Sequence, residues 1–563
     1  MNKPHPFSIG VLAVAVLVLI SSGGCHSTTK PPGPTPQASR ESVLSTVKFD
    51  DVAATDGLDV TLSIKGKRPY NILDTMGSGC ALLDYDGDGN LDILILGEHA
   101  SLFKGDGKDH FTDVTRAMGL DKVTTPTMGC AVGDYDNDGF EDLYLSGYRC
   151  GILLHNEHGQ GFNDVSAAAG IRPQPWGTSA AFVDIDSDGR LDLYVGNYVK
   201  FDQDTKPQLC ASANGVMGVC APVVYKPLRG VLYHNDGLGR FSDVTGPLNA
   251  VNSGNNLGVA FADFDGSGHQ SLMLANDQMP GNLLVSDGHR FTDIGSGSGV
   301  ATDAEGATYG GMGIDWGDYD NDGKLDVAVA TFQYEPKCVF HNDGNHVFSE
   351  VSSRLGLASI TRNDVSFGEK WLDADNDGWL DLMIANGHVQ DNIAETDSTK
   401  SFRQPTRFFL NGGGSKLVDS PSSLSGDAGA QIVGRGLAIG DFDNDGKIDA
   451  LVIDIQGHPL LLHNASPSAG HWLEVNLVGT AKSNRDGQGA TVTAEAASVK
   501  ILRECTTSGS YMSASDKRVH MGIGVASTID TLSIHWPDGH LDTYRGVKAD
   551  RIVTVREGQT ATP

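Results

Sequence analysis

The chain has 563 residues, enough for several domains or for one long repeat array. Its formal charge of −30 comes from 71 acidic and 41 basic residues. Because no basic patch appears, this charge argues against nucleic acid as a partner. The 71 glycines and the short alternating apolar runs favour an all-β chain with many tight turns.

The first predicted element is an export signal over residues 1–25. Lys3 precedes an apolar run, Ile9 to Ile20, that is too short to span a bilayer as a helix. Small residues then lead into Cys25, as in a bacterial lipoprotein signal whose cysteine is lipidated; an ordinary signal peptide cleaved nearby is the alternative. Residues 26–42 form a Pro/Ser/Thr-rich tether. We therefore expect an exported chain, lipid-anchored in the cell envelope (outer membrane or cell surface) or otherwise periplasmic or secreted.

Seven copies of one nine-residue loop, D-x-D-x-D-G-x-x-D, occur within residues 43–464. Oxygen ligands at positions 1, 3, 5 and 9, a backbone carbonyl at position 7 and Gly at position 6 suit Ca²⁺. The predicted ligand residues, loop by loop, are Asp84, Asp86, Asp88, Asn90 and Asp92; Asp134, Asp136, Asp138, Phe140 and Asp142; Asp184, Asp186, Asp188, Arg190 and Asp192; Asp263, Asp265 and Ser267; Asp318, Asp320, Asp322, Lys324 and Asp326; Asp373, Asp375, Asp377, Trp379 and Asp381; Asp441, Asp443, Asp445, Lys447 and Asp449.

A simple turn between strands is the alternative interpretation of these loops, since Asp-Gly pairs are common turn residues. It explains the Gly but not four acids at fixed spacing, which repel by a few kcal/mol per pair at about 4 Å and an effective dielectric of about 20. Six loops keep all four acids, whereas Ser267 and Ser271 replace two of them in the fourth. We predict six Ca²⁺ sites and a degenerate seventh.

A second motif, an Asn-centred turn followed by F-x-D-V, comes after most of these loops, and LYHNDGLGRFSDV at 232–244 is the clearest copy. Each unit then has the four strands of an antiparallel blade. The last unit lacks F-x-D-V, and one such segment stands alone at Phe49–Val52. We predict that Lys48–Val52 completes the last blade of a seven-bladed β-propeller over residues 43–464. A linear array is the alternative, but it leaves that strand unpaired.

The propeller geometry places the loops on one face and the longest insertions, about 198–230 and 388–405, on the other. Aromatic rings beside amides and carboxylates on that second face suit a sugar or peptide ligand, although ordinary polar loops are the alternative. The ligand-face candidates are Trp176, Tyr198, Asn276, Asp277, Phe332, Tyr334, Asn386 and His388.

Cysteine spacing gives one disulfide prediction. Cys210 and Cys220 lie ten residues apart in an inserted loop of an exported chain and are the best candidate pair. Cys80 and Cys130 occupy equivalent positions before the first two loops, and burial is favoured over a bond between them. Cys150, Cys338 and Cys505 have no obvious partner.

The Asp loops stop at the C-terminal segment 465–560, whose alternating apolar runs predict a small β-sandwich-like domain. WLEVNLVGTAKSNRDGQGATV, SGSYMSASDKRVHMGIG and IHWPDG resemble the ASPIC/UnbV domain, and GRGLAIGDFDNDGKID at 434–449 resembles FG-GAP/VCBS repeats. This resemblance implies a calcium-binding, extracytoplasmic propeller of the kind found in the integrin α-subunit head and in cartilage acidic protein, with adhesion or matrix binding as its role. It transfers no catalytic residue.

Three functions remain open at this stage. A binding or adhesion module for a glycan or an extracellular or envelope protein is favoured, because no catalytic motif appears. A structural or assembly partner in the envelope is the second reading. The third is a polysaccharide lyase, for which His388 with Asp364 and the cations Arg362, Lys370 and Arg435 are the candidates. The His residues of the turn motif, such as His155 and His234, are expected to have a structural turn role.

Overall fold

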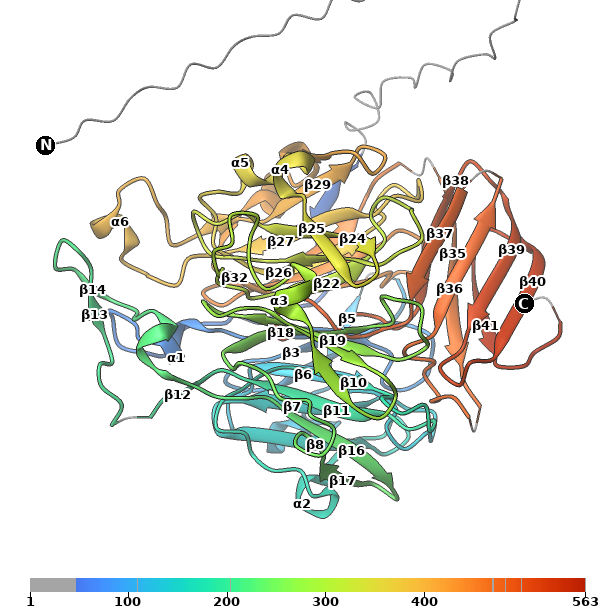
Figure 1. Ribbon diagram of the computed structural model, residues 1–563, viewed down its shortest axis with the longest axis horizontal. Coiled ribbons are helices and arrows are strands. Elements are labelled where there is room, and N and C mark those ends of the chain that lie inside the picture. The colour runs from blue at the N-terminus through green and yellow to red at the C-terminus, as the bar shows by residue number, and fades with distance from the viewer. Residues whose placement is uncertain are drawn as a thin grey trace, which may run out of the picture. The chain divides into compact units, whose positions relative to one another are not determined.

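The computed structural model describes residues 47–563 except 109, 203, 468–469, 481, 498 and 562. Cys25 and the tether at 26–42 lie outside the described residues. Strands dominate the described chain, and each of its α-helices is four residues long (Figure 1). None of the helices in this part of the chain has the length and apolar character needed to cross a bilayer.

Seven four-stranded antiparallel sheets lie within residues 49–464 of the described chain, numbered here in the order of their loops. Their strands are β2 (Cys80–Leu83), β3 (Asp92–Ile95), β4 (Ser101–Gly105) and β5 (Phe111–Asp113); β6 (Gly129–Gly133), β7 (Asp142–Gly147), β8 (Cys150–Asn156) and β9 (Phe162–Asp164); β10 (Gly177–Val183), β11 (Asp192–Asn197), β16 (Val231–Gly237) and β17 (Arg240–Asp243); β18 (Asn256–Ala262), β19 (Ser271–Asn276), β20 (Asn282–Ser286) and β21 (Phe291–Asp293); β22 (Ile314–Gly317), β23 (Asp326–Val329), β24 (Cys338–Gly344) and β25 (Val347–Glu350); β26 (Ser366–Leu372), β27 (Asp381–Asn386), β29 (Arg407–Asn411) and β30 (Leu417–Asp419); β32 (Gly434–Gly440), β33 (Asp449–Asp454), β34 (Leu460–Asn464) and β1 (Phe49–Asp51).

The sheets pack face to face in a closed ring. The first strand of each sheet contacts the first strands of its two neighbours, and β32 of the seventh sheet contacts β2 of the first. Each neighbouring pair also shares a buried apolar cluster; Leu451 of the seventh sheet, for example, lies in one cluster with Ile93 of the first. Because the first strands are covered on both faces, all seven residues of β10 are buried. This ring is a β-propeller, and we interpret each sheet as one blade.

The ring is closed by the N-terminal strand. β1 pairs antiparallel with β34, and Asp50 lies opposite His463. The backbone N–H of Val52 also donates to the carbonyl of Leu461 at 2.9 Å. The predicted outer strand from Lys48–Val52 is therefore present, and it removes the free edge that a linear array would expose.

The remaining elements of the ring are short. The helices are α1 (Ile72–Thr75), α2 (Ser166–Ala169), α3 (Gly295–Ser298), α4 (Ser352–Leu355), α5 (Leu357–Ile360) and α6 (Ile393–Thr396), with the 3₁₀ turns η2 (Leu120–Lys122), η3 (Pro222–Val224), η4 (Pro421–Ser423) and η5 (Gly426–Gly429). Three two-stranded pairs join β12 (Val199–Lys200) to β15 (Lys226–Pro227), β13 (Cys210–Ala211) to β14 (Met217–Gly218), and β28 (Gln404–Pro405) to β31 (Gln431–Ile432).

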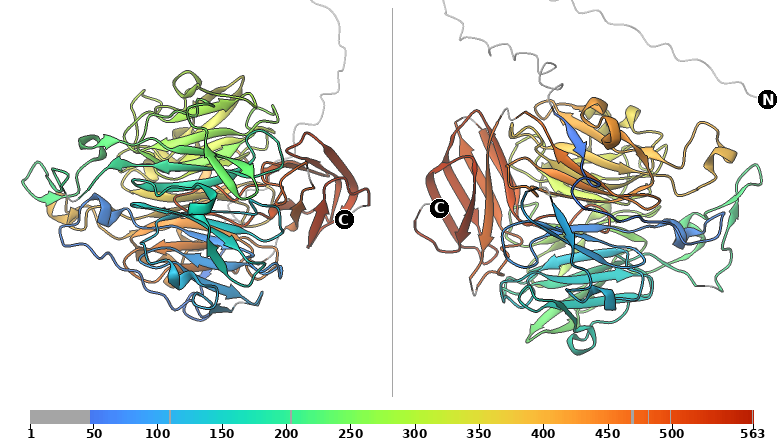
Figure 2. Two further views of the ribbon diagram at one scale, coloured as in Figure 1. Left: turned by 90° about the horizontal axis from the view of Figure 1, so that it is seen from below. Right: turned by 180° about the vertical axis from the view of Figure 1, so that it is seen from behind.

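The C-terminal segment forms two further sheets. One holds β38 (Val519–Gly524), β35 (His471–Val478) and β41 (Arg551–Arg556); the other holds β37 (Val499–Glu504), β36 (Thr491–Ala496), β39 (Thr528–His535) and β40 (Leu541–Lys548). Both contribute to one buried apolar cluster, in which Leu473 of the first sheet lies with Val492 and Trp536. Figures 1 and 2 show these strands (red) on one side of the ring, and β13, β14 and α6 on the opposite side.

Residues 506–516, which we call the central segment, leave the C-terminal sheets and enter the middle of the ring. They bond to the first strands of six sheets, through Cys80, Val132, Ser179, Ile314, Lys370 and Ile439. Tyr511 and Met512 have no exposed surface. The segment therefore fills the channel that the first strands surround.

Candidate metal loops and ligand-binding face

The second Asp loop shows the geometry of five of the six loops with four acids, and the loop at 318–326 lacks only one of its bonds. Both oxygens of Asp134 accept backbone N–H groups of its own loop, from Asp138 at 2.9 Å and from Gly139 at 2.7 Å. Asp142 accepts from Tyr135 N–H at 3.2 Å and from Asn156 N–H at 2.8 Å. The first Asp thus shapes the turn, while the ninth fastens the loop to the third strand of its sheet.

The loops lie side by side on one face of the ring, which we call the loop face. The fourth residue of several loops donates its side-chain amide to the sixth-position Gly carbonyl of the next loop. Asn137 donates to Gly189 at 2.8 Å, and Asn444 of the last loop donates to Gly89 of the first at 3.3 Å. The predicted grouping of the loops on one face is therefore present.

The donor set of these loops fits a hard divalent cation. Asp326 is fully buried, and one of its carboxylate oxygens has no hydrogen-bond partner; one oxygen of Asp320, in the same loop, is likewise unpaired. Burial, together with the nearby carboxylates Asp136 and Asp134, raises the pKa of Asp142 to about 9. A cation ligated by oxygen would offset this crowding of negative charge. Several such clusters of Asp side chains can hold a metal ion.

Histidines approach these loops in a way that the sequence analysis missed. His155 Nε2 lies 3.0 Å from Asp136, His234 lies 3.2 Å from Asp186, and His341 and His463 make the same contact in their own sheets. The expected turn contact is also present, since Nδ1 of His155 lies 3.2 Å from Glu157 and Nδ1 of His234 lies 3.0 Å from Asp236 in the turns that follow. These residues belong to the third strands, and their Nε2 atoms reach the third-position Asp. In the first sheet Lys104 takes this position and pairs with both Asp86 and Asp88.

The fourth loop folds without a full set of acids. Asp263 accepts Gly268 N–H at 2.9 Å, and the Ser271 hydroxyl accepts Ser286 N–H at 3.2 Å, where the other loops use their ninth Asp. His346 lies 2.7 Å from Asp265. The backbone of the loop thus folds with only two carboxylates, and a weaker metal site or none at this loop stays a prediction.

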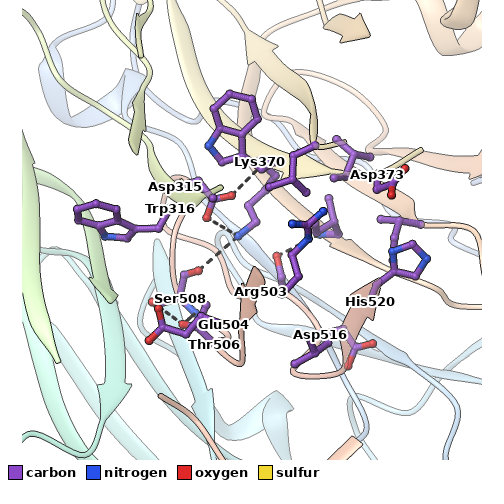
Figure 3. Close-up of a pocket in the computed structure, with 18 of the residues that line it drawn as sticks. Asp315, Trp316, Lys370, Asp373, Arg503, Glu504, Thr506, Ser508, Asp516 and His520 are labelled. Atoms are coloured by element: carbon purple, nitrogen blue, oxygen red, sulfur yellow. Dashed lines mark hydrogen bonds and ion pairs between the residues drawn. The ribbon is translucent and has the colours of Figure 1, made fainter. Parts of the chain in front are cut away.

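The C-terminal domain packs on the loop face, which the sequence analysis did not predict. Asp486 accepts the backbone N–H of Asp134 at 2.7 Å, and Arg518 donates to the carbonyl of Asp441 at 2.7 Å. Figure 3 shows the cavity of about 120 Å³ that remains between the ring and this domain. In it, Lys370 Nζ lies 2.7 Å from Asp315 and 3.5 Å from the Ser508 carbonyl.

The lyase candidates are placed unfavourably. Lys370 is buried in its ion pair with Asp315, and Arg435 is fully buried, where it donates to carbonyls such as that of Thr75. Asp364 is buried and pairs with Arg407, so it is not free to act with His388. Two of the three cations proposed to bind a uronate are therefore unavailable, because interior hydrogen bonds already occupy them.

Most of the ligand-face candidates are not on the surface. Trp176, Tyr198, Asn276, Asn386 and His388 are buried, whereas Tyr334 is exposed and Asp277 and Phe332 are partly exposed. The expectation of exposed rings is wrong for Trp176 and Tyr198, because the inserted segment from β12 to β15 covers them and Phe201 packs against Trp176. Whether these residues contribute to binding stays a prediction.

Three of the candidates nevertheless meet at one cavity on the face opposite the loops. Tyr198, Asp277 and Phe332 line a space of about 360 Å³ together with the β13–β14 hairpin. Tyr198 donates its hydroxyl to Asp277 at 2.6 Å. The two long insertions also contact each other here, since Asn392 donates to the Met217 carbonyl at 2.9 Å. The insertions therefore build a walled cavity rather than a flat surface.

The cysteines divide as the spacing predicted. Cys210 and Cys220 form a disulfide at the base of the β13–β14 hairpin. Cys80 and Cys130 are buried and free, as are Cys150, Cys338 and Cys505. Burial raises the pKa of Cys80 to about 12, so its thiol stays protonated at neutral pH.

Both the ring and the C-terminal segment contain residues that match known protein families. Residues 84–145 and 318–384 match the FG-GAP-like repeat, and residues 479–562 match the family described as ASPIC and UnbV. The chain is also similar to cartilage acidic protein 1. It is 24% identical to the Xenopus tropicalis protein over 68% of this chain and 54% of that protein, and 24% identical to the Mus musculus protein over 70% and 56%. The chain thus spans about half the length of these relatives.

Solved structures give weaker similarities. A lectin of Agrocybe aegerita that recognises non-reducing terminal N-acetylglucosamine has a TM-score of 0.36 and 15% identity, covering 68% of this chain and 87% of the lectin. YCF48 of Cyanidioschyzon merolae has a TM-score of 0.39 and 8% identity, covering 70% and 97%. An exotype rhamnogalacturonan lyase, YesX, has a TM-score of 0.30 and 12% identity, covering 85% and 91%. These values are too low to indicate a ligand or a reaction.

Proposed function

We propose that this chain, with its FG-GAP-like repeats and its ASPIC and UnbV segment, is a non-catalytic binding module of the cell envelope. Its ligand would be a glycan or an extracellular or envelope protein, held on the face opposite the loops. The observation that carries the proposal is the cavity on that face, which is enclosed by two long insertions and a disulfide. Concave sites of this kind are where ligands usually bind.

The loops would bind Ca²⁺ and would act on stability rather than on the ligand. They lie on the face covered by the C-terminal domain, and the cavity lies on the other. Asp136, Asp138 and His155 form one of the clusters whose ligand atoms lie within 4.8 Å of one another. In our proposal oxygen atoms of the loop ligate the ion, and His155 donates a hydrogen bond to one of those ligands, since Ca²⁺ prefers oxygen.

Export and lipid anchoring complete the proposal. They are supported by the sequence of residues 1–25 and by the disulfide, because disulfides persist in oxidising compartments. A lipid on Cys25 would leave residues 26–42 as the tether between the membrane and the ring.

The test is retention of residues 40–563 on an array of glycans and matrix proteins, first in calcium and then in chelator. Calcium-dependent retention on one chemical class would support the binding module and would identify its ligand. If a folded, calcium-loaded sample is not retained anywhere, the proposal fails and assembly with another envelope protein becomes the better reading.

A further inference from the structure

The cavity on the face opposite the loops has apolar walls. Its volume of about 360 Å³ is within the usual range for small-molecule sites. Met76, Leu257, Met312 and Phe367 line it from the ring, and Val219 lines it from the disulfide hairpin. Behind this wall lies the tip of the central segment, where the Tyr511 ring packs 4.9 Å from the Phe367 ring. The wall is therefore backed by packed side chains.

These apolar walls contain a single carboxylate, that of Asp277. Asp277 is the only acidic or basic residue among the described residues that line the cavity. It accepts a hydrogen bond from Tyr198, and no ion pair joins it to a cationic side chain in the described chain. Glu335 adds a second negative charge nearby, and burial raises the pKa of Asp277 to about 7. At pH 7 the Asp277 carboxyl is therefore partly ionised, and a cation beside it would favour the ionised form.

Aromatic rings surround the same space. Tyr198, Phe332 and Phe367 all line the cavity with Asp277. A carboxylate among aromatic side chains is an environment that attracts organic cations, because the ring faces and the carboxylate both favour positive charge. A carbohydrate would instead need several polar partners, whereas Asp277, Gln278 and Gln390 are among the few polar residues here.

We propose that this cavity binds a small organic ammonium ion, with its charged nitrogen beside Asp277 and its carbon body against the apolar wall. The inference rests on the proposed role of this face in ligand binding. It narrows that role to one chemical class at one place, and the array experiment above does not depend on it.

Choline and its neutral isostere 3,3-dimethylbutan-1-ol form a matched pair of probes, because they differ in charge but hardly in shape. We expect the full chain, purified in calcium, to bind choline at least about tenfold more tightly than the alcohol by isothermal titration calorimetry. Phenethylammonium tests a primary ammonium at the same site. Asp277→Asn should remove the preference for charge with either cation.

Glu395→Gln is the control variant, because Glu395 lies exposed on α6 and is not among the lining residues. It should bind choline as the unmodified chain does. If neither cation binds, if the alcohol binds as tightly as choline, or if Asp277→Asn keeps the preference in a folded sample, the inference is wrong. Retention on the array with no choline binding would overturn this inference alone and leave the proposed function standing.

Discussion

Asn156 donates its side-chain amide to the backbone carbonyl of Tyr85, which lies in the Asp loop of the neighbouring sheet, at 2.7 Å. The same amide also donates to the carbonyl of Glu141 in its own sheet at 2.9 Å. The bond between sheets recurs from Asn235 to Tyr135, from Asn342 to Phe264, from Asn411 to Tyr319 and from Asn464 to Ala374. A buried Asn on the third strand thus joins each of these sheets to the loop of the sheet before it.

Replacement of one such Asn should destabilise the ring. Asn235→Ala leaves the carbonyls of Tyr135 and Leu191 buried without their amide donor, and we expect a loss of about 1–3 kcal/mol in the free energy of unfolding. Urea unfolding measures it. Asn163→Ala is the control, because Asn163 is exposed and bonds only to the side chain of Glu157 among its described contacts. Equal effects of the two variants would contradict the role of Asn235.

Removal of metal should lower the melting temperature strongly. If the loops bind Ca²⁺ independently, each contributes about 2.7 kcal/mol at 100-fold saturation. Asp320→Ala should reduce the number of bound ions by one in equilibrium dialysis. It removes the third-position carboxylate, one of whose oxygens makes no hydrogen bond and is available to an ion. Ser267→Ala, in the loop with only two acids, should change little. An unchanged melting curve after complete removal of metal would show that the loops are turns alone.

Lys104 should lower the Ca²⁺ affinity of the first loop relative to that of the second. Its ammonium group pairs with Asp86 and lies 2.9 Å from Asp88, where the second loop has the imidazoles of His155 and His158. Lys104→Met removes this competing charge, and we expect a gain of about tenfold in the Ca²⁺ affinity of that loop, or about 1.4 kcal/mol. Calcium titration calorimetry compares it with Lys108→Met, an exposed neighbour in the following turn. A lower affinity after the change would mean that Lys104 supports the loop.

The parts of the fold that could be predicted are those that depend on the spacing of residues close together in the sequence. The acids of each loop lie within nine residues, so their convergence follows from one turn. The closing strand was predictable because Phe49–Val52 was an F-x-D-V segment without a partner, and β1 pairs with β34 as expected. The third-strand His and Asn residues carried a usable signal, since His-Asn recurs at the same place in several units.

Two features could not be predicted because they depend on long-range packing. The central segment is rich in Ser and Thr, a composition typical of exposed loops, yet it is buried because backbone and side-chain groups of six first strands supply its hydrogen bonds. Trp176 was expected on the surface because it lies in a connection between blades. It is buried because a segment more than twenty residues later in the chain folds over it.

The central segment should make the ring and the C-terminal domain unfold together. Tyr511 is fully buried, so Tyr511→Ala should cost about 3–5 kcal/mol, whereas Tyr511→Phe loses only the hydrogen bond to the Met76 carbonyl, worth about 1 kcal/mol. In calorimetry with calcium present, we expect one transition that moves as a whole in both variants. Two separate transitions, with only one shifted, would contradict this coupling.

Because His388 is buried, the free energy of unfolding should decrease as the pH is lowered. Its Nδ1 accepts the backbone N–H of Gln390 at 2.9 Å, and this requires the neutral ring. Burial, together with the cations Arg435 and Lys400, lowers the pKa of His388 to about 3. Because the unfolded chain then binds a proton that the folded chain does not, this residue destabilises the fold as pH falls below about 6.5, by about 2 kcal/mol at pH 5.

His388→Gln keeps an acceptor in place of Nδ1 but does not titrate, so it should flatten the decline in stability between pH 7 and pH 5. Urea unfolding at a series of pH values measures this slope in calcium. His289→Gln is the control, since His289 lies in an exposed turn and its backbone N–H, not its ring, bonds to Asp287. The same slope in the chain with and without His388 would show that its ring is protonated in the folded state, and that the Gln390 bond does not hold it neutral.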